Sequence, residues 1–144
     1  MNDTIVKFGY PGTLLAEYDR WVVLLRQKQV TAGSMVLACK EDALALGDVS
    51  AEAWGELSRA TADVEAAARA AFAYDRINYL ALMMVDPHVH FHVLPRHETP
   101  REIAGAVITD EAWPRPPDVT RAADLTGEQL TAIGERLRGG WPQR

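Results

Sequence analysis

The sequence predicts an α+β fold in which short antiparallel strands pack against a long helix. Two observations indicate this fold class. Apolar runs of strand length are separated by polar turns, and one longer stretch carries apolar residues at helical spacing. A chain of 144 residues has the length of one ordinary domain, which buries roughly 70% of the surface that its unfolded chain exposes. We therefore predict one domain over residues 1–144.

A hairpin is predicted near the beginning of this fold. Residues 21–25 read WVVLL, an apolar run typical of a buried strand, and a second apolar run covers residues 35–39. The polar residues 26–29 and Ala32-Gly33 lie between them, so we expect the two strands to pair. Cys39, the only cysteine, lies in the second run. It cannot form an intramolecular disulfide, and we interpret it as a small buried apolar residue.

A long amphipathic helix is predicted near residues 51–73. Ser50 is a suitable N-cap, and Glu52 stands in the first turn, where an acidic side chain is favourable. Apolar residues then recur at helical spacing, namely Trp54, Leu57, Val64, Ala68, Ala71 and Phe72. We expect Trp54, like Trp21 in the first strand, to lie in the core.

Two further strands are predicted after the helix. Residues 77–85 form a strand-like apolar run, and Asp86-Pro87 supplies a tight turn into a strand that carries histidines. A tight turn joins antiparallel neighbours, so we expect these two strands to pair. Tyr79 and the Met83-Met84 pair are expected to pack against the core.

The chain is expected to become irregular beyond Pro95. Residues 113–117 read WPRPP, and proline removes a backbone donor and fixes φ, so this stretch predicts an extended loop. Trp113 in this loop is a candidate for a pocket or a dimer contact, because an exposed aromatic ring can stack or pack.

A short helix is predicted near the end of the chain. Thr126 and Gln129 form a Thr-x-x-Gln capping box, and Gly139-Gly140 ends the helix. Its apolar face carries Leu130, Ile133 and Leu137.

Composition excludes several classes of partner. The formal net charge is −5 at pH 7 and no block of Lys or Arg occurs, so we expect no binding to a long nucleic acid. The longest apolar run is far below the ~20 residues of a membrane span, and the first residues lack the pattern of a secretory signal. We therefore expect a cytoplasmic protein that does not bind membranes.

The segment from residue 86 to residue 97 holds all four histidines, and three of them recur every second residue. Side chains alternate between the two faces of a strand, so His88, His90 and His92 would share one face. The opposite face would carry Val89, Phe91 and Val93. This pattern predicts a strand with one core face and one functional face.

Two kinds of chemistry fit a row of imidazoles. Zinc binds imidazole nitrogen, but the Cα atoms of His88 and His92 in an extended strand stand about 13 Å apart, too far for three rings to converge on one ion. The nearest further ligands are His97 and Asp86. Phosphoryl or nucleotidyl transfer instead needs a neutral imidazole that attacks phosphorus, with neighbouring donors for the oxygens. An imidazole with a pKa of about 6.5 is mostly neutral at pH 7.

The string from His88 to Pro95, HVHFHVLP, resembles the His-φ-His-φ-His-φ-φ signature of the histidine triad superfamily of nucleotide hydrolases and transferases, where φ is hydrophobic. The order of predicted elements is also similar, and the resemblance covers roughly residues 15–97. The run Val-Leu-Pro-Arg at residues 93–96 looks most like the fragile histidine triad branch of dinucleoside polyphosphate hydrolases and its bacterial relatives. The resemblance implies a HIT-like fold, an antiparallel sheet of about five strands with one long and one short helix.

The resemblance also implies roles for the three histidines. His90 would attack the α-phosphorus and become transiently nucleotidylated, after which water hydrolyses the intermediate. His88 would support the intermediate and orient the ring, and His92 would contact the phosphate oxygens and the bridging oxygen of the leaving group. No metal and no cofactor are required, and family members are commonly homodimers.

The chain departs from the family pattern before the triad. The best-known branches carry a polar loop there, with a Gln or Ser that contacts the leaving group, whereas only Asp86-Pro87 separates the predicted strand from His88. Polar residues near the predicted strands are either replacements for that donor or exposed turn and strand-end residues, namely Arg26, Gln27, Lys28, Asn78 and Arg96.

Two functions are consistent with these observations. The first is a nucleotide hydrolase that cleaves a nucleoside 5′-phosphoric anhydride or a related bond, such as that of a dinucleoside polyphosphate or a nucleoside phosphoramidate, through a nucleotidyl intermediate on His90. The alternative is a nucleotide-binding or zinc-binding regulatory protein with the same fold and no turnover.

Overall fold

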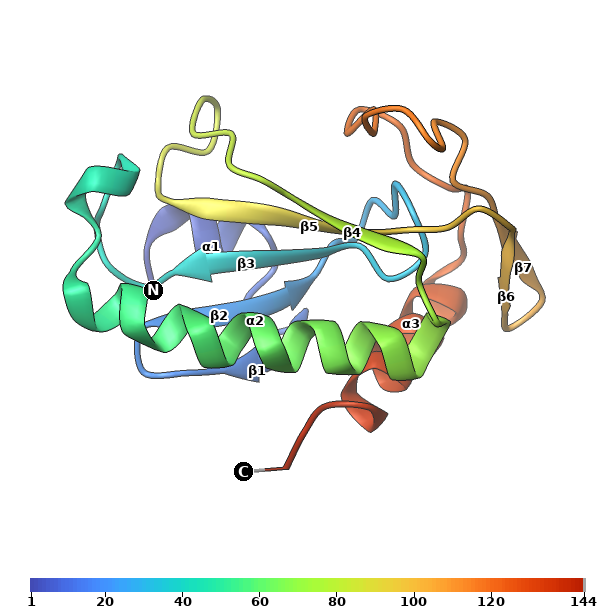
Figure 1. The fold of residues 1–144 in the computed structure, drawn as a ribbon, viewed down its shortest axis with the longest axis horizontal. Helices are drawn as coiled ribbons and strands as arrows, with labels where there is room; N and C mark the ends of the chain where they lie inside the picture. Colours follow the sequence, from blue (N-terminus) through green and yellow to red (C-terminus); the bar gives the residue numbers. More distant parts are fainter. Residues whose placement is uncertain (144) are drawn as a thin grey trace.

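A computed structural model describes residues 1–143 of the chain. The elements, in chain order, are α1 (Asp3–Lys7), β1 (Leu14–Glu17), β2 (Trp21–Leu25), β3 (Met35–Cys39), a 3-10 turn (Leu46–Asp48), α2 (Ala51–Phe72), β4 (Arg76–Leu80), β5 (His90–Arg96), β6 (Arg101–Ile103), β7 (Ala106–Ile108) and α3 (Gly127–Gly139). Five strands form one antiparallel sheet in the order β1-β2-β3-β5-β4, and β6 and β7 form a separate hairpin (Figure 1). The predicted α+β fold with about five antiparallel strands is confirmed.

The predicted hairpin and both predicted helices are present. Strand β2 pairs with β3 from Trp21↔Cys39 to Leu25↔Met35. At the start of α2 the Ser50 side chain accepts a hydrogen bond from the backbone N–H of Ala53. Helix α2 ends at Phe72, one residue before the predicted boundary. The capping box that opens α3 has both of its hydrogen bonds.

One face of the sheet is covered by α2 and α3. Apolar side chains of the strands meet both helices in the main core, and its fully buried members include Trp21, Leu37, Val64, Ile133 and Leu137. The side chains of Val89, Phe91 and Val93 point into this core, as the alternation along the strand predicts. Cys39 is also buried there.

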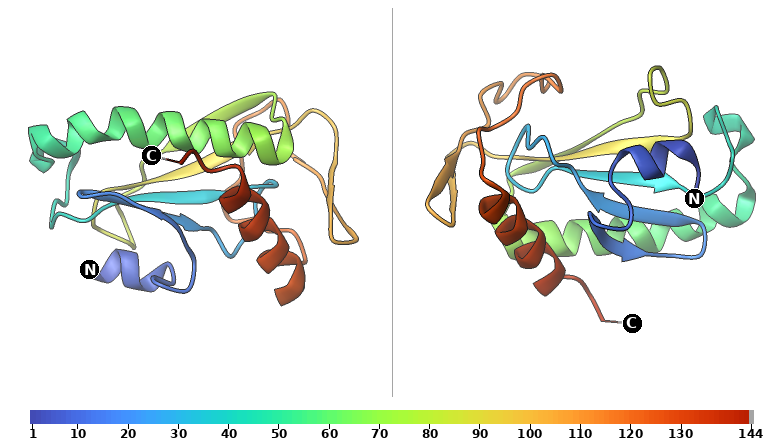
Figure 2. Two further views of the ribbon diagram at one scale, coloured as in Figure 1. Left: turned by 90° about the horizontal axis from the view of Figure 1, so that it is seen from below. Right: turned by 180° about the vertical axis from the view of Figure 1, so that it is seen from behind.

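The opposite face of the sheet is covered by the first residues of the chain. Figure 2 (left) shows α1 and α2 on opposite sides of the sheet. A second apolar cluster forms under α1, where Ile5 packs on Val22, Leu24, Val36 and Ala38. Neither α1 nor β1 was expected from the sequence.

The predicted strand over residues 77–85 is wrong in its second half. Strand β4 ends at Leu80, which pairs with His92, and residues 81–89 form a loop. Just before β5, the backbone N–H of Val89 donates to the carbonyl of Ala43, in the segment that follows β3, and not to β4. Residues 81–85 therefore have no strand to pair with. Asp86-Pro87 is consequently part of a long loop and not a tight two-residue turn.

The region beyond Pro95 is more regular than expected. Strand β5 continues to Arg96, and the β6–β7 hairpin follows it. The Arg96 guanidinium forms a buried, two-point ion pair with Asp110, at 2.7 and 3.0 Å, and also donates to Asn78 Oδ1. This pair fixes the segment after β7 against the sheet. Residues 113–117 form a loop, as predicted.

Two predictions of core packing are also wrong. Trp54 lies at the edge of the core with 38% of its surface exposed, although Trp21 is fully buried. Met84 is 84% exposed because it lies in the loop that replaces the predicted strand, whereas Met83 and Tyr79 pack against the core as expected.

None of the helices within residues 1–143 is long and apolar enough to cross a membrane.

Candidate active site

The ladder between β3 and β5 positions two of the three triad histidines. His90 lies opposite Ala38 and His92 lies opposite Val36, so both side chains share the face that α1 covers. Their rings meet edge to face with centroids 5.1 Å apart. His90 is completely buried and His92 is 7% exposed. The sequence prediction that these two histidines share one face is therefore confirmed.

The hydrogen bond of the His90 ring determines which nitrogen is free. Its Nδ1 lies 2.7 Å from the carbonyl oxygen of His88. A carbonyl oxygen can only accept, so Nδ1 carries the proton and the lone pair of the neutral ring is on Nε2. The Nε2 atom is buried and has no hydrogen-bond partner in the described structure. The lone pair on His90 Nε2 is thus not used by any hydrogen bond within the described residues.

His88 precedes β5, and its ring is directed to α1. Its backbone N–H donates to Thr4 Oγ1 over 3.3 Å, and the same hydroxyl lies 3.0 Å from its ring Nδ1. An oxygen that accepts from the backbone can still donate its own proton, so the hydroxyl donates to Nδ1. The ring Nε2 then carries a proton and faces Asp42 Oδ1 at 3.9 Å. Thr4 thus holds His88 in place, and the backbone carbonyl of His88 in turn accepts the hydrogen bond from His90 Nδ1.

His92 is held in the neutral form. Burial, and then the positive charge of Arg26, lower the pKa of His92 to about 4, which the charge of Asp86 only partly offsets. Its Nδ1 atom is buried without a hydrogen-bond partner in the described structure. Arg26, whose role the sequence left open, directly follows β2 in the chain.

His97, the fourth histidine, is not part of this site. Its Nε2 lies 2.9 Å from the carbonyl oxygen of Ala32, and its ring packs edge-on against Phe72 in the main core. Burial lowers its pKa. His97 therefore serves packing, and it cannot join the triad histidines as a metal ligand.

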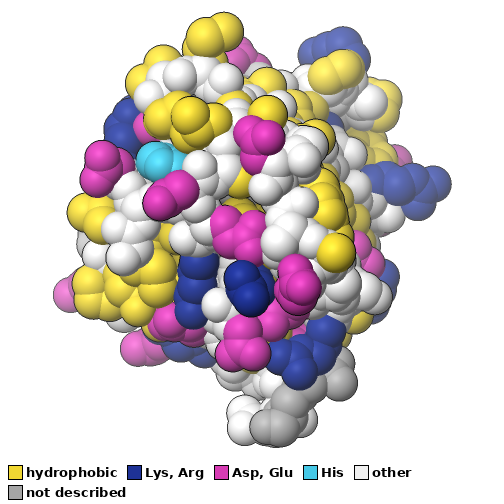
Figure 3. Space-filling view, turned by 90° about the vertical axis from the view of Figure 1, so that its left-hand side faces the viewer, with side chains coloured by type: hydrophobic (Ala, Val, Ile, Leu, Met, Phe, Trp, Pro, Cys, Tyr) yellow, Lys and Arg dark blue, Asp and Glu magenta, His cyan; other side chains and the backbone are white. Residues whose placement is uncertain are grey.

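The N-terminal segment covers the histidines. The ring centroid of Phe8 lies 5.5 Å from that of His90 and 5.9 Å from that of His92. Lys7 forms an ion pair of 2.6 Å with Asp86, so α1 is joined to the loop before β5. Figure 3 shows only a small histidine surface on this side of the molecule, with acidic side chains beside it. His90 Nε2 is therefore shielded from solvent in this structure.

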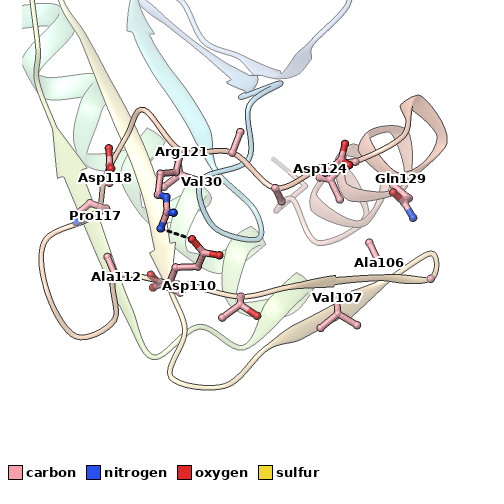
Figure 4. A pocket seen from close by; sticks show the side chains of 16 residues that line it. Val30, Ala106, Val107, Asp110, Ala112, Pro117, Asp118, Arg121, Asp124 and Gln129 are labelled. Atoms are coloured by element: carbon pink, nitrogen blue, oxygen red, sulfur yellow. Dashed lines mark ion pairs between the residues drawn. The ribbon is translucent and has the colours of Figure 1, made fainter.

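Two pockets lie away from the triad histidines. One of about 610 Å³ lies between the β6–β7 hairpin, residues 109–125 and the start of α3 (Figure 4). Its charged lining is largely acidic, and Arg121 is paired with Glu111. The other, a groove of about 820 Å³, follows β4 and includes Trp113. No triad histidine lines either pocket. His90 and His92 are themselves buried in this structure.

Within residues 1–143, no three His, Cys, Asp or Glu side chains are grouped so that they could hold a metal ion. The ring of His88 contacts Thr4, while the rings of His90 and His92 lie under Phe8.

The HIT domain family matches residues 8–99, about two thirds of the chain. The chain belongs to the HIT domain family. This HIT protein is similar over nearly its whole length to solved structures of histidine triad proteins. Those from Sinorhizobium meliloti and Bradyrhizobium japonicum are each 18% identical with a TM-score of 0.74, covering 97% and 98% of this chain and 95% and 96% of theirs. A hypothetical histidine triad nucleotide-binding protein from Sulfolobus tokodaii is 17% identical with a TM-score of 0.69, covering 95% and 88%. No curated protein matches the chain.

The structure of this HIT protein also shows what sequence reasoning missed. Thr4, Lys7 and Phe8 contact the triad or its loop, yet nothing in the sequence indicated a role for residues 1–13. The loop before the triad is present over residues 81–89, but it contains no Gln or Ser. Among the polar residues left open, Asn78 and Arg96 belong to the buried ion-pair network and only Arg26 acts on a triad histidine.

Proposed function

We propose that this HIT protein is a nucleotidyl hydrolase that cleaves a nucleoside 5′-phosphoric anhydride or a related bond through a covalent intermediate on His90. One observation carries this proposal: Nδ1 of His90 donates to the His88 carbonyl, which leaves a buried Nε2 lone pair without a partner. A nucleophile that is oriented by a second group is the arrangement that covalent catalysis needs.

The proposed reaction has two steps. His90 Nε2 attacks the α-phosphorus and forms a P–N bond, while the bond from phosphorus to the leaving group breaks and the leaving atom takes the electron pair. Water then attacks the phosphorus, the P–N bond breaks with its electron pair returning to Nε2, and a nucleoside monophosphate is released. His92 lies beside His90, where its ring contacts the phosphate oxygens and the bridging atom. No metal or cofactor takes part in this proposal.

The leaving group and the assembly state are part of the same proposal. The run from Val93 to Arg96 supports placing the chain near the fragile histidine triad branch, and hence a dinucleoside polyphosphate or phosphoramidate substrate. Strand β4 stands at the edge of the sheet, and its five consecutive residues line a groove with Trp113. An open strand edge pairs readily with another chain, which supports a homodimer through β4. Light scattering of the purified protein measures its mass.

The test is turnover by the wild type and by His90→Gln. The wild type is offered dinucleoside polyphosphates, nucleoside phosphoramidates and adenylyl sulfate, and the variant should lose at least about 10³-fold in rate while it still binds mononucleotide. Mass spectrometry of the wild type quenched during turnover should show one added nucleotidyl group on His90. His97→Gln is the matched control, because it changes an equally buried histidine outside the site and should keep turnover within a few-fold.

A second candidate function is a nucleotide-binding protein without turnover. The observation that favours it is the complete burial of His90 under Phe8. If the wild type binds mononucleotide but turns over no substrate of the panel, this second function replaces the first. Product formation that does not depend on His90 would contradict the covalent mechanism.

A further inference from the structure

Arg26 lies on the face of the sheet that α1 covers and that carries His90 and His92, which we call the histidine face. Along the strands it lies two residues beyond the level of His92. Its backbone N–H donates to the carbonyl of Ser34 over 3.0 Å, which extends the β2–β3 ladder by one pair beyond Leu25↔Met35. Side chains alternate along a strand, so Arg26 shares the face of Leu24. The charge of Arg26 also acts on His92, which agrees with this placement.

The register arranges the site in three successive rows. Ala38 and His90 form the first row, and Val36 and His92 form the second. Arg26 and Ser34 form the third. Adjacent rows on one face are about 7 Å apart, because each spans two residues of strand. A phosphate that His90 attacks therefore lies two rows away from the backbone of Arg26.

Arg26 is a partly buried cation without an anionic partner. Its guanidinium donates to the carbonyl of Lys28 from Nη1 and to the carbonyl of Val119 from Nη2, over 2.6 and 3.0 Å. No carboxylate is paired with it among residues 1–143. Burial lowers the pKa of this guanidinium. Arg96 shows the contrast, because its buried charge is neutralised by Asp110. A buried cation is costly unless an anion accompanies it.

Unpartnered polar atoms gather on the same face. Within the described residues, four buried side-chain atoms have no hydrogen-bond partner, and three of them are Arg26 Nε, His90 Nε2 and His92 Nδ1. Unpartnered buried polar groups are uncommon and indicate a function or an absent ligand. The Arg26 Nε–H is a donor, and its natural partner is an anionic oxygen.

We propose that Arg26 binds a second phosphate group of the substrate, on the His92 side of the phosphorus that His90 attacks. This inference rests on the proposed function, and it narrows the substrate class to nucleotides that carry two phosphates. The second phosphate belongs either to the phosphate chain or to the sugar, and both sources present the same anionic oxygens to the guanidinium.

Binding of three adenine ligands, and of their guanine counterparts, tests the proposal. AMP carries one phosphate, ADP carries the second in the chain, and adenosine 3′,5′-bisphosphate carries it on the sugar. In the wild type one of the two bisphosphorylated ligands should bind at least about 10-fold more tightly than AMP, since charge-assisted hydrogen bonds contribute this much. Calorimetric titration measures the three dissociation constants, and the ligand that gains affinity identifies the source.

Three variants complete the experiment. Arg26→Gln should abolish the gain and leave AMP binding within about 3-fold, because it removes only the contact to the second phosphate. Arg26→Lys keeps the charge but not the planar fork, so it should keep part of the gain. Arg121→Gln removes the same charge from an exposed site and should keep all of it. If thermal melting shows Arg26→Gln to be unfolded, Arg26→Lys decides the test.

A second readout does not need a ligand. The pKa of His92, followed by NMR titration, should rise in Arg26→Gln because a nearby positive charge is removed.

The proposal is overturned if neither bisphosphorylated ligand binds better than AMP, or if Arg26→Gln weakens all three ligands equally. If AMP binds and the gain is missing, only this inference fails. If the wild type binds no nucleotide at all, the proposed function fails with it.

Discussion

The two faces of the sheet are both buried, but they treat polar groups differently. On the face under α2, the indole N–H of Trp21 donates to the carbonyl of Ala53 over 2.7 Å, and the hydroxyl of Tyr18 donates to Asp63 over 2.8 Å. On the face under α1, polar atoms of His90, His92 and Arg26 are buried without partners. Among the described residues, the face under α2 leaves one buried polar atom without a partner, Nδ1 of His97, whereas the face under α1 leaves three.

The comparison predicts that stability depends mainly on the face under α2, and that the proposed chemistry takes place on the face under α1. A buried polar group without a partner costs about 1–3 kcal/mol, so a cluster of three such groups on one face marks a candidate functional site. The face under α2 holds the larger apolar cluster, and it offsets this cost. Changes on that face should therefore lower stability, and changes on the histidine face should alter protonation and access.

The largest effect on stability is expected from Leu37→Ala. Leu37 is fully buried in β3 on the face under α2, so the substitution removes buried apolar surface and leaves a cavity. We expect a loss of about 2–5 kcal/mol in the free energy of unfolding, measured by urea denaturation. Leu44→Ala, at a residue that is more than half exposed, is the control and should change stability by less than about 0.5 kcal/mol. A loss below about 1 kcal/mol at Leu37 would contradict the assignment of stability to this face.

A smaller effect, on the pH dependence of stability, is expected from His92→Leu. The pKa of His92 is about 4 in the folded chain, against about 6.5 for an unfolded one, so only the unfolded state binds the proton between these values. Wild-type stability should therefore fall by up to about 3 kcal/mol from pH 7 towards pH 4. The variant lacks this contribution and the unpartnered Nδ1, so it should be the more stable protein at pH 5.

Urea denaturation of both proteins at several values between pH 5 and pH 7.5 measures this difference. The range avoids the titration of carboxylates, and His97, whose pKa is also lowered by burial, contributes equally to both proteins. Identical pH slopes for the wild type and His92→Leu would show that His92 is not held neutral in the folded chain.

Much of the sheet could be predicted because its signals are local. The apolar runs of β2 and β3 with a turn between them predicted a hairpin, and the capped periodic stretch predicted α2. The apolar run over residues 77–85 contained no sign that pairing stops at Leu80. The length of a strand depends on its partner, and β5 begins only at His90. Met84 and Val85 are apolar and yet mostly exposed, so periodicity could not show this loop.

The candidate site could be predicted only along its own strand. A period of two among the histidines was enough to place His90 and His92 on one face. The contact of Thr4 with His88 joins residues 84 positions apart, and α1, with five residues, is too short to show a periodic pattern. The placement of Arg26 one row beyond His92 depends on the register of three strands, which could not be read from the sequence.

The smallest effect on stability is expected from Phe8→Ala, which acts on the cover of the histidine face. The Phe8 ring is only partly buried, so its removal should cost about 1–2 kcal/mol. It should also expose His90 Nε2, and modification of His90 by diethyl pyrocarbonate, located by mass spectrometry, should become faster. Tyr74→Ala removes a similarly buried ring from the other face and is the matched control. Equal rates of His90 modification in the two variants would mean that general loosening of the fold, and not removal of the Phe8 ring, opens the site.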